Sequence, residues 1–153
     1  MAKYAARQER TRIAKFSESL LEDWLCSPDE RWRIADVLAN SGCRGTSDGW
    51  VGRSWSAVRQ LPFGDCGCAD IVLFSNRVIH VVELKSVQAD GNTLGQVLEY
   101  ARYLDTHIDR ELWADAIQSE RPVVVPVIIA PSFSHRLVSA AEFCGCDLLT
   151  VQW

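Results

Sequence analysis

The chain has 153 residues, of which 48% are hydrophobic and 24% charged, with a formal net charge of −4. This composition is typical of one soluble domain with a hydrophobic core and argues against a disordered chain. No apolar run approaches the roughly 20 residues that span a bilayer, and the N-terminus lacks a signal peptide's apolar core, so a soluble, cytoplasmic protein with reduced cysteines is expected.

A single domain over residues 1–153 is expected, with a basic arm or helix at about 1–16. Within its first fifteen residues the chain has five Lys or Arg residues and one Glu. Such a segment is typical of an arm that contacts phosphates, or equally of a solvated helix face.

Helical patterns come first in the chain. Residues 17–26 have leucines and a tryptophan at helical spacing, and residues 27–40 begin with a Ser cap followed by Pro28 and end before Gly42. The four glycines between residues 41 and 52 indicate a loop.

Strand patterns then alternate with helical ones. Three strand candidates, at 53–61 and in two runs between 70 and 86, precede a helix at 92–107 and a further short helix at 109–120. An apolar strand at 122–131 follows, in which Pro126 indicates an edge or a bulge, and then a capped helix at 132–145 and a strand at 146–153. The order α-α-β-β-β-α-α-β-α-β predicts an α/β fold with a mixed central sheet flanked by helices.

Three ionisable groups converge on one face of the hairpin between residues 70 and 86. A two-residue turn at 76–77 pairs Ser75 with Val78, so that Asp70 falls opposite Glu83 and Lys85 lies on the same face. Two adjacent carboxylates repel each other unless cations compensate, and Mg²⁺ prefers such oxygen ligands. The cluster is therefore either a surface ion network or a metal site suited to phosphodiester hydrolysis.

A longer motif order carries a family resemblance. Asp70, then Glu83-Leu84-Lys85, then Gln96-x-x-x-Tyr100 resembles the PD-(D/E)XK nuclease superfamily, and more narrowly the catalytic domain of NucS-type (EndoMS) endonucleases, over most of residues 17–153. The resemblance implies a restriction-endonuclease-like fold. It also implies a metal-dependent endonuclease acting on DNA rather than RNA, in repair, restriction or phage-related defence.

The resemblance also implies the metal ligands. Asp70 and Glu83 would hold Mg²⁺ or Mn²⁺ together with the Leu84 carbonyl, and Lys85 would be the catalytic lysine. Ala69 stands where the superfamily's first motif has a proline.

Further residues would border this site by the same resemblance. Gln96 and Tyr100 would contact substrate or tune water, although a polar rim on a packed helix explains them as well. Glu22, or Glu18, would supply an additional acid, although acids four residues apart are also ordinary helix surface.

The means of finding the substrate are left open. NucS proteins have a separate DNA-binding and dimerising domain, and we expect no such domain within residues 1–153, so that the chain's own loop, a homodimer or a partner protein would supply specificity. Arg44, Arg53, Trp55 and Arg59 mix cations and aromatics as single-strand binders do, or serve burial or a dimer contact.

Two rival functions stay open. One is a non-catalytic nucleic-acid-binding or regulatory module that retains the nuclease fold. The other is a structural zinc protein, because the Cys-Gly-Cys strings at 66–68 and 144–146 hold four cysteines, although Cys146 can simply be buried and Gly145 can cap a helix.

Overall fold

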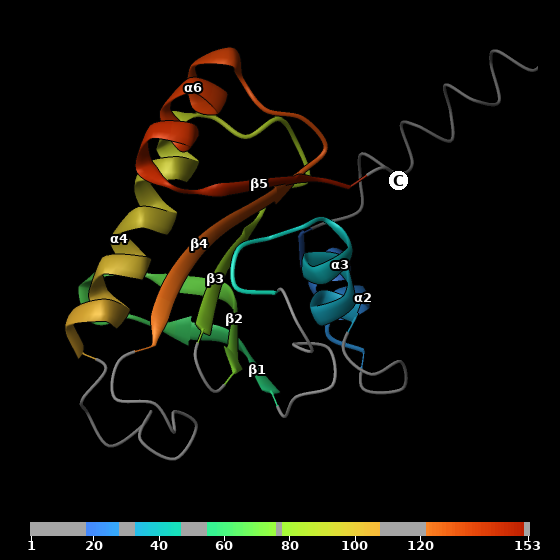
Figure 1. Cartoon of the computed structure of the whole chain (residues 1–153), viewed down its shortest axis with the longest axis vertical. Coiled ribbons are helices and arrows are strands. Elements are labelled where there is room, and N and C mark those ends of the chain that lie inside the picture. Colours follow the sequence, from blue (N-terminus) through green and yellow to red (C-terminus); the bar gives the residue numbers. More distant parts are fainter. Residues whose placement is uncertain (1–17, 28–32, 47–54, 76–77, 108–121, 152–153) are drawn as a thin grey trace, which may run out of the picture.

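A mixed five-stranded sheet organises the molecule. The structure, a computed structural model, describes residues 18–27, 33–46, 55–75, 78–107 and 122–151. Within these residues the strand order is β1-β2-β3-β4-β5, antiparallel from β1 to β3 and parallel from β3 to β5 (Figure 1). The strands are β1 (Trp55–Pro62), β2 (Cys68–Ser75), β3 (Val78–Leu84), β4 (Val123–Ala130) and β5 (Asp147–Thr150). The predicted α/β class with a mixed sheet is confirmed.

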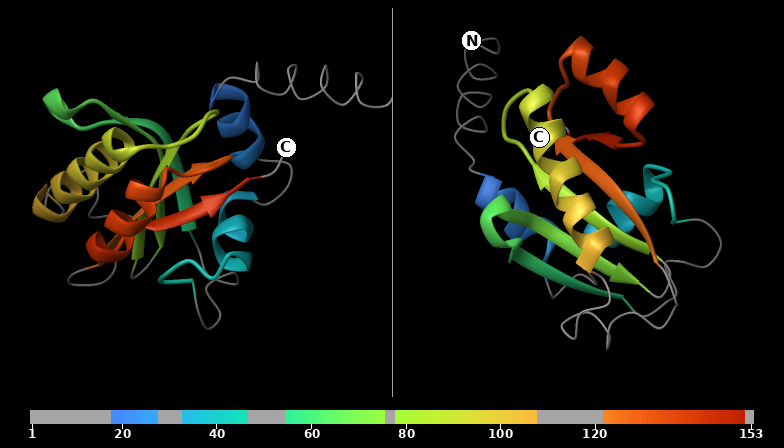
Figure 2. Two further views of the ribbon diagram at one scale, coloured as in Figure 1. Left: turned by 90° about the horizontal axis from the view of Figure 1, so that it is seen from above. Right: turned by 90° about the vertical axis from the view of Figure 1, so that its left-hand side faces the viewer.

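Helices cover both faces of this sheet. On one face lie α2 (Glu18–Leu25) and α3 (Arg33–Asn40), and on the other α4 (Gly91–His107) and α6 (His135–Cys144), as the two views of Figure 2 show. A short 3₁₀ helix (Gly64–Cys66) joins β1 to β2. None of the helices in the described ranges is long and apolar enough to cross a membrane.

Strand β3 is the centre of the core, with every residue buried. Val82 and Leu84 pack in the hydrophobic cluster of α2 and α3, whereas Ile79 and Val81 pack in that of α4 and α6. Alternate residues of a strand point to opposite faces, so burial on both sides fixes the register of β3 against its neighbours.

Pro126 lies at a local edge of the sheet, one of the two alternatives predicted for it. Strand β4 lies between β3 and β5, and its pairing with β3 runs without a break from Val78↔Val123 to Leu84↔Ile129, so there is no bulge. The printed pairing with β5 begins only at Val127↔Asp147. Pro126 therefore sits just before β5 begins, where a missing N–H costs no bond to that strand.

Several predicted segments fall outside the described residues. These are the arm at 1–16, the start of the second helix at 28–32, the loop after residue 46, the turn residues 76–77 and the short helix at 109–120. The other helices and strands lie where the sequence patterns predict them.

Helix α6 has the predicted caps at both ends. The Ser134 hydroxyl accepts a hydrogen bond from the Leu137 N–H at 3.2 Å. Gly145 ends the helix with φ +71°, and a Cβ there would lie 2.9 Å from the Arg44 guanidinium. Glycine therefore lets the chain turn into β5.

We expect Gly145→Ala to lower the free energy of unfolding by about 1–2 kcal/mol, because an L side chain is strained at positive φ. Gly95→Ala is the matched control: Gly95 lies within α4 with open space around its Cα, and alanine there should raise stability by up to about 1 kcal/mol. Urea denaturation measures both. Equal effects of the two substitutions would contradict this assignment of the cap.

Candidate active site

The β2–β3 hairpin brings two acids together. Its pairs run from Phe74↔Ile79 to Ile71↔Val82, the register predicted from the sequence, and Asp70 and Glu83 are the next residues on each strand. One carboxylate oxygen of Asp70, Oδ2, accepts a hydrogen bond from the Leu84 N–H at 2.8 Å. The acid of β2 is thus fixed against the end of β3.

A lysine lies beside the second acid. Lys85 Nζ is 3.6 Å from Glu83 Oε1, so the pair forms a salt bridge at the end of β3. Glu83 is buried, with 4% of its surface exposed, and its other oxygen, Oε2, has no hydrogen-bond partner. A buried carboxylate oxygen left without a donor is costly, and in native proteins it calls for an explanation such as a bound ion.

Helix α2 adds two further acids to this region. Glu22 is buried, and its Oε2 accepts a hydrogen bond from Gln60 Nε2 at 2.8 Å. The same nitrogen donates to Asp70 Oδ1 at 3.1 Å, so Gln60 connects the helix acid to the strand acid. Glu18 Oε1 accepts from the Ser86 N–H at 3.3 Å. Glu22 and Glu18 therefore lie at the Asp70 and Glu83 sides of the cluster, respectively.

Gln96 and Tyr100 lie on α4, next to the strand acids. Gln96 Nε2 donates to the Tyr100 hydroxyl at 2.9 Å, and Tyr100 is almost completely buried. Its ring packs on Phe63, with centroids 5.4 Å apart, and a Cβ at Gly67 would come within 2.9 Å of its hydroxyl. Tyr100 is therefore wedged under the β1–β2 connection, with its hydroxyl held by Gln96.

Burial and like charges shape the acidity of both strand acids. Burial raises the pKa of Glu83 to about 8, with the negative charge of Asp70 adding to the effect and the Lys85 ammonium opposing it. Burial also raises the pKa of Asp70, against the hydrogen bonds from the Leu84 N–H and the Gln60 amide. Burial, more than the nearby charges of Glu83 and Asp70, raises the pKa of Tyr100.

The donor set fits a hard divalent cation. Two carboxylates from adjacent strands share one ammonium, and the unpartnered Glu83 oxygen is a free ligand position. In the part of the chain that the structure describes, no three His, Cys, Asp or Glu side chains form a group that could hold a metal. An ion at Asp70 and Glu83 would therefore take its other ligands from backbone, water or substrate oxygens, as Mg²⁺ commonly does.

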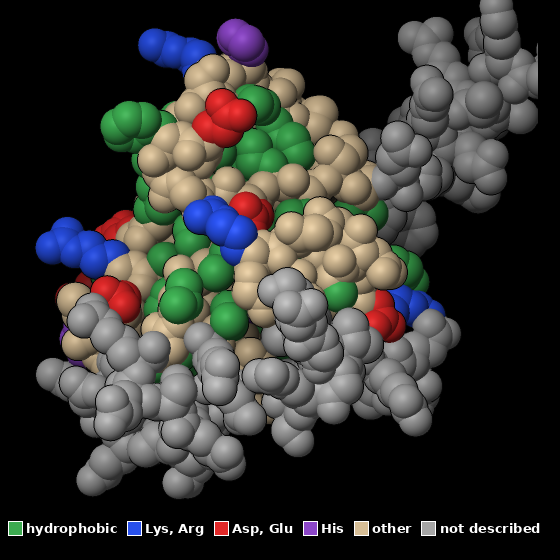
Figure 3. Space-filling model, in the orientation of Figure 1, with side chains coloured by type: hydrophobic (Ala, Val, Ile, Leu, Met, Phe, Trp, Pro, Cys, Tyr) green, Lys and Arg blue, Asp and Glu red, His purple; other side chains and the backbone are tan. Residues whose placement is uncertain are grey.

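Of the predicted nucleic-acid contacts, Arg59 lies at the acidic cluster, where acids of α2 bind its guanidinium, and Arg44 lies elsewhere. Arg59 Nε lies 2.6 Å from Glu22 Oε1, and its guanidinium also pairs with Asp23. Arg44 pairs with Asp147 at 3.2 Å, near the β5 end of the molecule. The side chain of Trp55 and all of Arg53 lie outside the description. On the face in Figure 3, basic side chains of the described residues are scattered singly rather than gathered in a patch.

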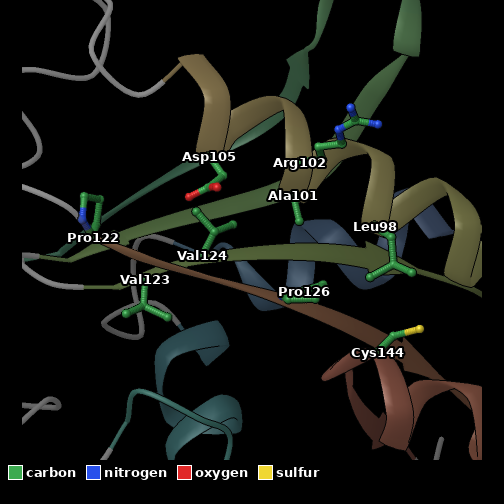
Figure 4. A pocket seen from close by; sticks show the side chains of 9 residues that line it. All are labelled: Leu98, Ala101, Arg102, Asp105, Pro122, Val123, Val124, Pro126 and Cys144. Atoms are coloured by element: carbon green, nitrogen blue, oxygen red, sulfur yellow. The ribbon is translucent and has the colours of Figure 1, made fainter.

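Two other features lie away from the acids. All six cysteines are free, and Cys66–Cys68 and Cys144–Cys146 belong to different connections, one before β2 and one before β5. A hollow of about 530 Å³ between α4, β4 and the end of α6 is lined mainly by apolar side chains, with Arg102 and Asp105 on its α4 side (Figure 4).

Sequence reasoning missed Gln60. Its place opposite Asp70 depends on how β1 pairs with β2, and the length and turn geometry of the connection at 63–67 do not set that register from the sequence alone. Its backbone φ of +48° has no signal in the sequence, since glutamine is not a residue that favours this conformation.

Comparisons with known proteins give matches among solved structures only. No protein-family model and no curated protein matches the sequence. Similar solved structures are an EndoMS–dsDNA complex (19% identity, 65% of this chain, TM-score 0.49), a repair endonuclease from Pyrococcus abyssi (20%, 78%, 0.49) and EndoMS in apo form (15%, 79%, 0.44). This chain covers 37%, 45% and 45% of their respective lengths.

The raised pKa of Glu83 predicts a pH-dependent stability. Between the ordinary value of 4.5 and about 8 the folded protein holds a proton that the unfolded chain releases, so stability falls as pH rises through this window. Glu83→Gln removes this loss. From pH 5 to pH 8.5 the free energy of unfolding of the wild type should therefore fall by about 2–4 kcal/mol more than that of the variant.

Urea unfolding at both pH values, without divalent ions, measures this difference. The control is Glu142→Gln, the same substitution at an exposed position on α6. A wild type and a Glu83→Gln variant with the same pH dependence would rule out the raised pKa.

Proposed function

We propose that this protein is a metal-dependent endonuclease that hydrolyses phosphodiester bonds, with DNA as the expected substrate. The observation that carries the proposal is the cluster of Asp70, Glu83 and Lys85. Two carboxylates from paired strands lie beside one ammonium, and one buried carboxylate oxygen has no partner. An ion pair with a purely structural role does not explain why Glu83 Oε2 is buried without a hydrogen-bond partner.

In this proposal Asp70 and Glu83 hold Mg²⁺ or Mn²⁺, with the Leu84 carbonyl as a further ligand. When bound, such an ion polarises a phosphoryl oxygen and lowers the pKa of a water molecule. The Leu84 N–H and the Gln60 amide each hold one oxygen of Asp70, which fixes the plane of this carboxylate before anything binds.

Lys85 supplies the positive charge of the site. With a quarter of its side chain exposed and its ammonium 3.6 Å from Glu83, it can reach both the acid and a phosphate at the surface. There it would stabilise the negative charge that develops on the phosphoryl group. Gln96 and the hydroxyl of Tyr100 form the α4 border of the site, and Glu22 is the additional acid on the α2 side.

The choice of DNA follows from the motif resemblance and not from a basic surface of the described residues. Specificity for strand, sequence or structure is assigned to segments or partners beyond this cluster, such as a homodimer or a second protein. The rival, a nucleic-acid-binding or regulatory module without catalysis, predicts binding of the same substrates without cleavage.

Cleavage of plasmid and single-stranded DNA in Mg²⁺ or Mn²⁺ tests the proposal. Glu83→Gln, Asp70→Asn and Lys85→Met should each lower the cleavage rate at least about 100-fold, because each removes a ligand or the stabilising charge. Glu142→Gln is the matched control and should cleave like the wild type. If Glu83→Gln cleaves as fast as the wild type, the activity does not come from this site; if no protein cleaves, the non-catalytic module is favoured.

A further inference from the structure

Gln60 has an unusual backbone for a strand residue. Its φ is +48°, and no other residue except glycine has a positive φ in the described part of the chain. It lies in β1 between the pairs Arg59↔Ile71 and Leu61↔Ala69, and so stands opposite Asp70. A left-handed conformation is costly for a residue with a side chain, and such residues often occur at functional sites.

The side-chain amide nitrogen of Gln60 donates two hydrogen bonds. Nε2 donates to Glu22 Oε2 at 2.8 Å and to Asp70 Oδ1 at 3.1 Å, which accounts for both of its hydrogens. The amide therefore holds two carboxylates, one from α2 and one from β2, that would otherwise repel each other.

The neighbouring residue completes the arrangement. Arg59 binds the other oxygen of Glu22 at 2.6 Å, so Arg59 and Gln60 together fix both oxygens of this acid. Asp70 is fixed in the same way, with Oδ1 on Gln60 and Oδ2 on the Leu84 N–H. Each carboxylate oxygen keeps a second lone pair for another ligand.

We propose that Gln60 is a positioning residue, which holds Asp70 in the orientation that binds the metal and keeps Glu22 beside it. This inference rests on the proposed function. Gln60 touches neither Glu83 nor Lys85 in the described contacts; it acts through Asp70 and Glu22. Hydrogen bonds behind metal ligands typically contribute 10–100-fold to metal affinity, and we expect this range here.

Calorimetric titration with Mn²⁺ alone measures this contribution without any substrate. Gln60→Leu keeps the bulk and removes the amide, and should weaken Mn²⁺ binding 10–100-fold. Gln60→Gly should weaken it to the same extent, and glycine tolerates the positive φ, so this variant tests the role even if the leucine variant unfolds. Gln88→Leu, the same substitution at an exposed residue, should bind Mn²⁺ like the wild type.

A second readout separates positioning from general stability. Thermal unfolding of Gln60→Gly should match the wild type, while the Mn²⁺ concentration that gives half-maximal DNA cleavage rises at least tenfold and excess Mn²⁺ restores the rate. Unchanged Mn²⁺ affinity in both Gln60 variants, with affinity lost in Asp70→Asn, would overturn the role of Gln60 and leave the proposed function intact. A wild type that binds no Mn²⁺ would overturn both.

Discussion

The register of β2 against β3 is the constraint on which the candidate site depends. It places Asp70 beside the Leu84 N–H, at the end of β3 where Glu83 and Lys85 form their salt bridge. A slip of one residue would turn Glu83 toward the hydrophobic cluster of α2 and α3, where an acid would have no charge partner. Because β3 is apolar and buried on both faces, such a slip would also expose or misplace most of the core. The packing of the sheet therefore fixes the positions of Asp70, Glu83 and Lys85, the charged cluster at the end of β3.

The charged cluster at the end of β3 lowers the stability of the folded protein. Four acids, Glu18, Glu22, Asp70 and Glu83, lie close enough for their negative charges to repel one another. The cations beside them are Lys85 and Arg59. Replacing buried charges by apolar side chains often stabilises a protein, so a cluster of this kind is hard to explain by folding alone. Local conflict of this sort is expected where a structure serves a function. The left-handed Gln60 is a second such conflict, and it lies within the same cluster.

Much of this arrangement could be predicted from local rules. Strand alternation with a two-residue turn fixes which residues of 70–86 oppose one another, and Gly145 predicts the C-terminal cap of α6. What could not be predicted depends on packing between distant segments. The burial of Tyr100 requires the β1–β2 connection to fold over α4, and the pairing of Arg59 with Glu22 requires α2 to lie against β1. The sequence could not show which strand leaves the edge at Pro126 open; this depends on β5, which is short and pairs with β4 only from Val127 onward.

Arg59 is paired with acids of α2, so its charge is not available to bind the phosphates of a nucleic acid. In the described ranges there are six Lys and Arg residues, and four of them already have partners: Arg33 over Trp24, Arg44 with Asp147, Arg59 with Glu22, and Lys85 with Glu83. Ten of the chain's 16 basic residues fall outside those ranges. Each phosphate neutralised by a protein cation releases bound counterions, so the steepness with which affinity declines in rising salt counts such contacts. A steep decline would assign the phosphate contacts to those ten residues together with Arg102 and Arg136, and a shallow one would leave the acidic cluster to recognise its substrate through the bound ion alone.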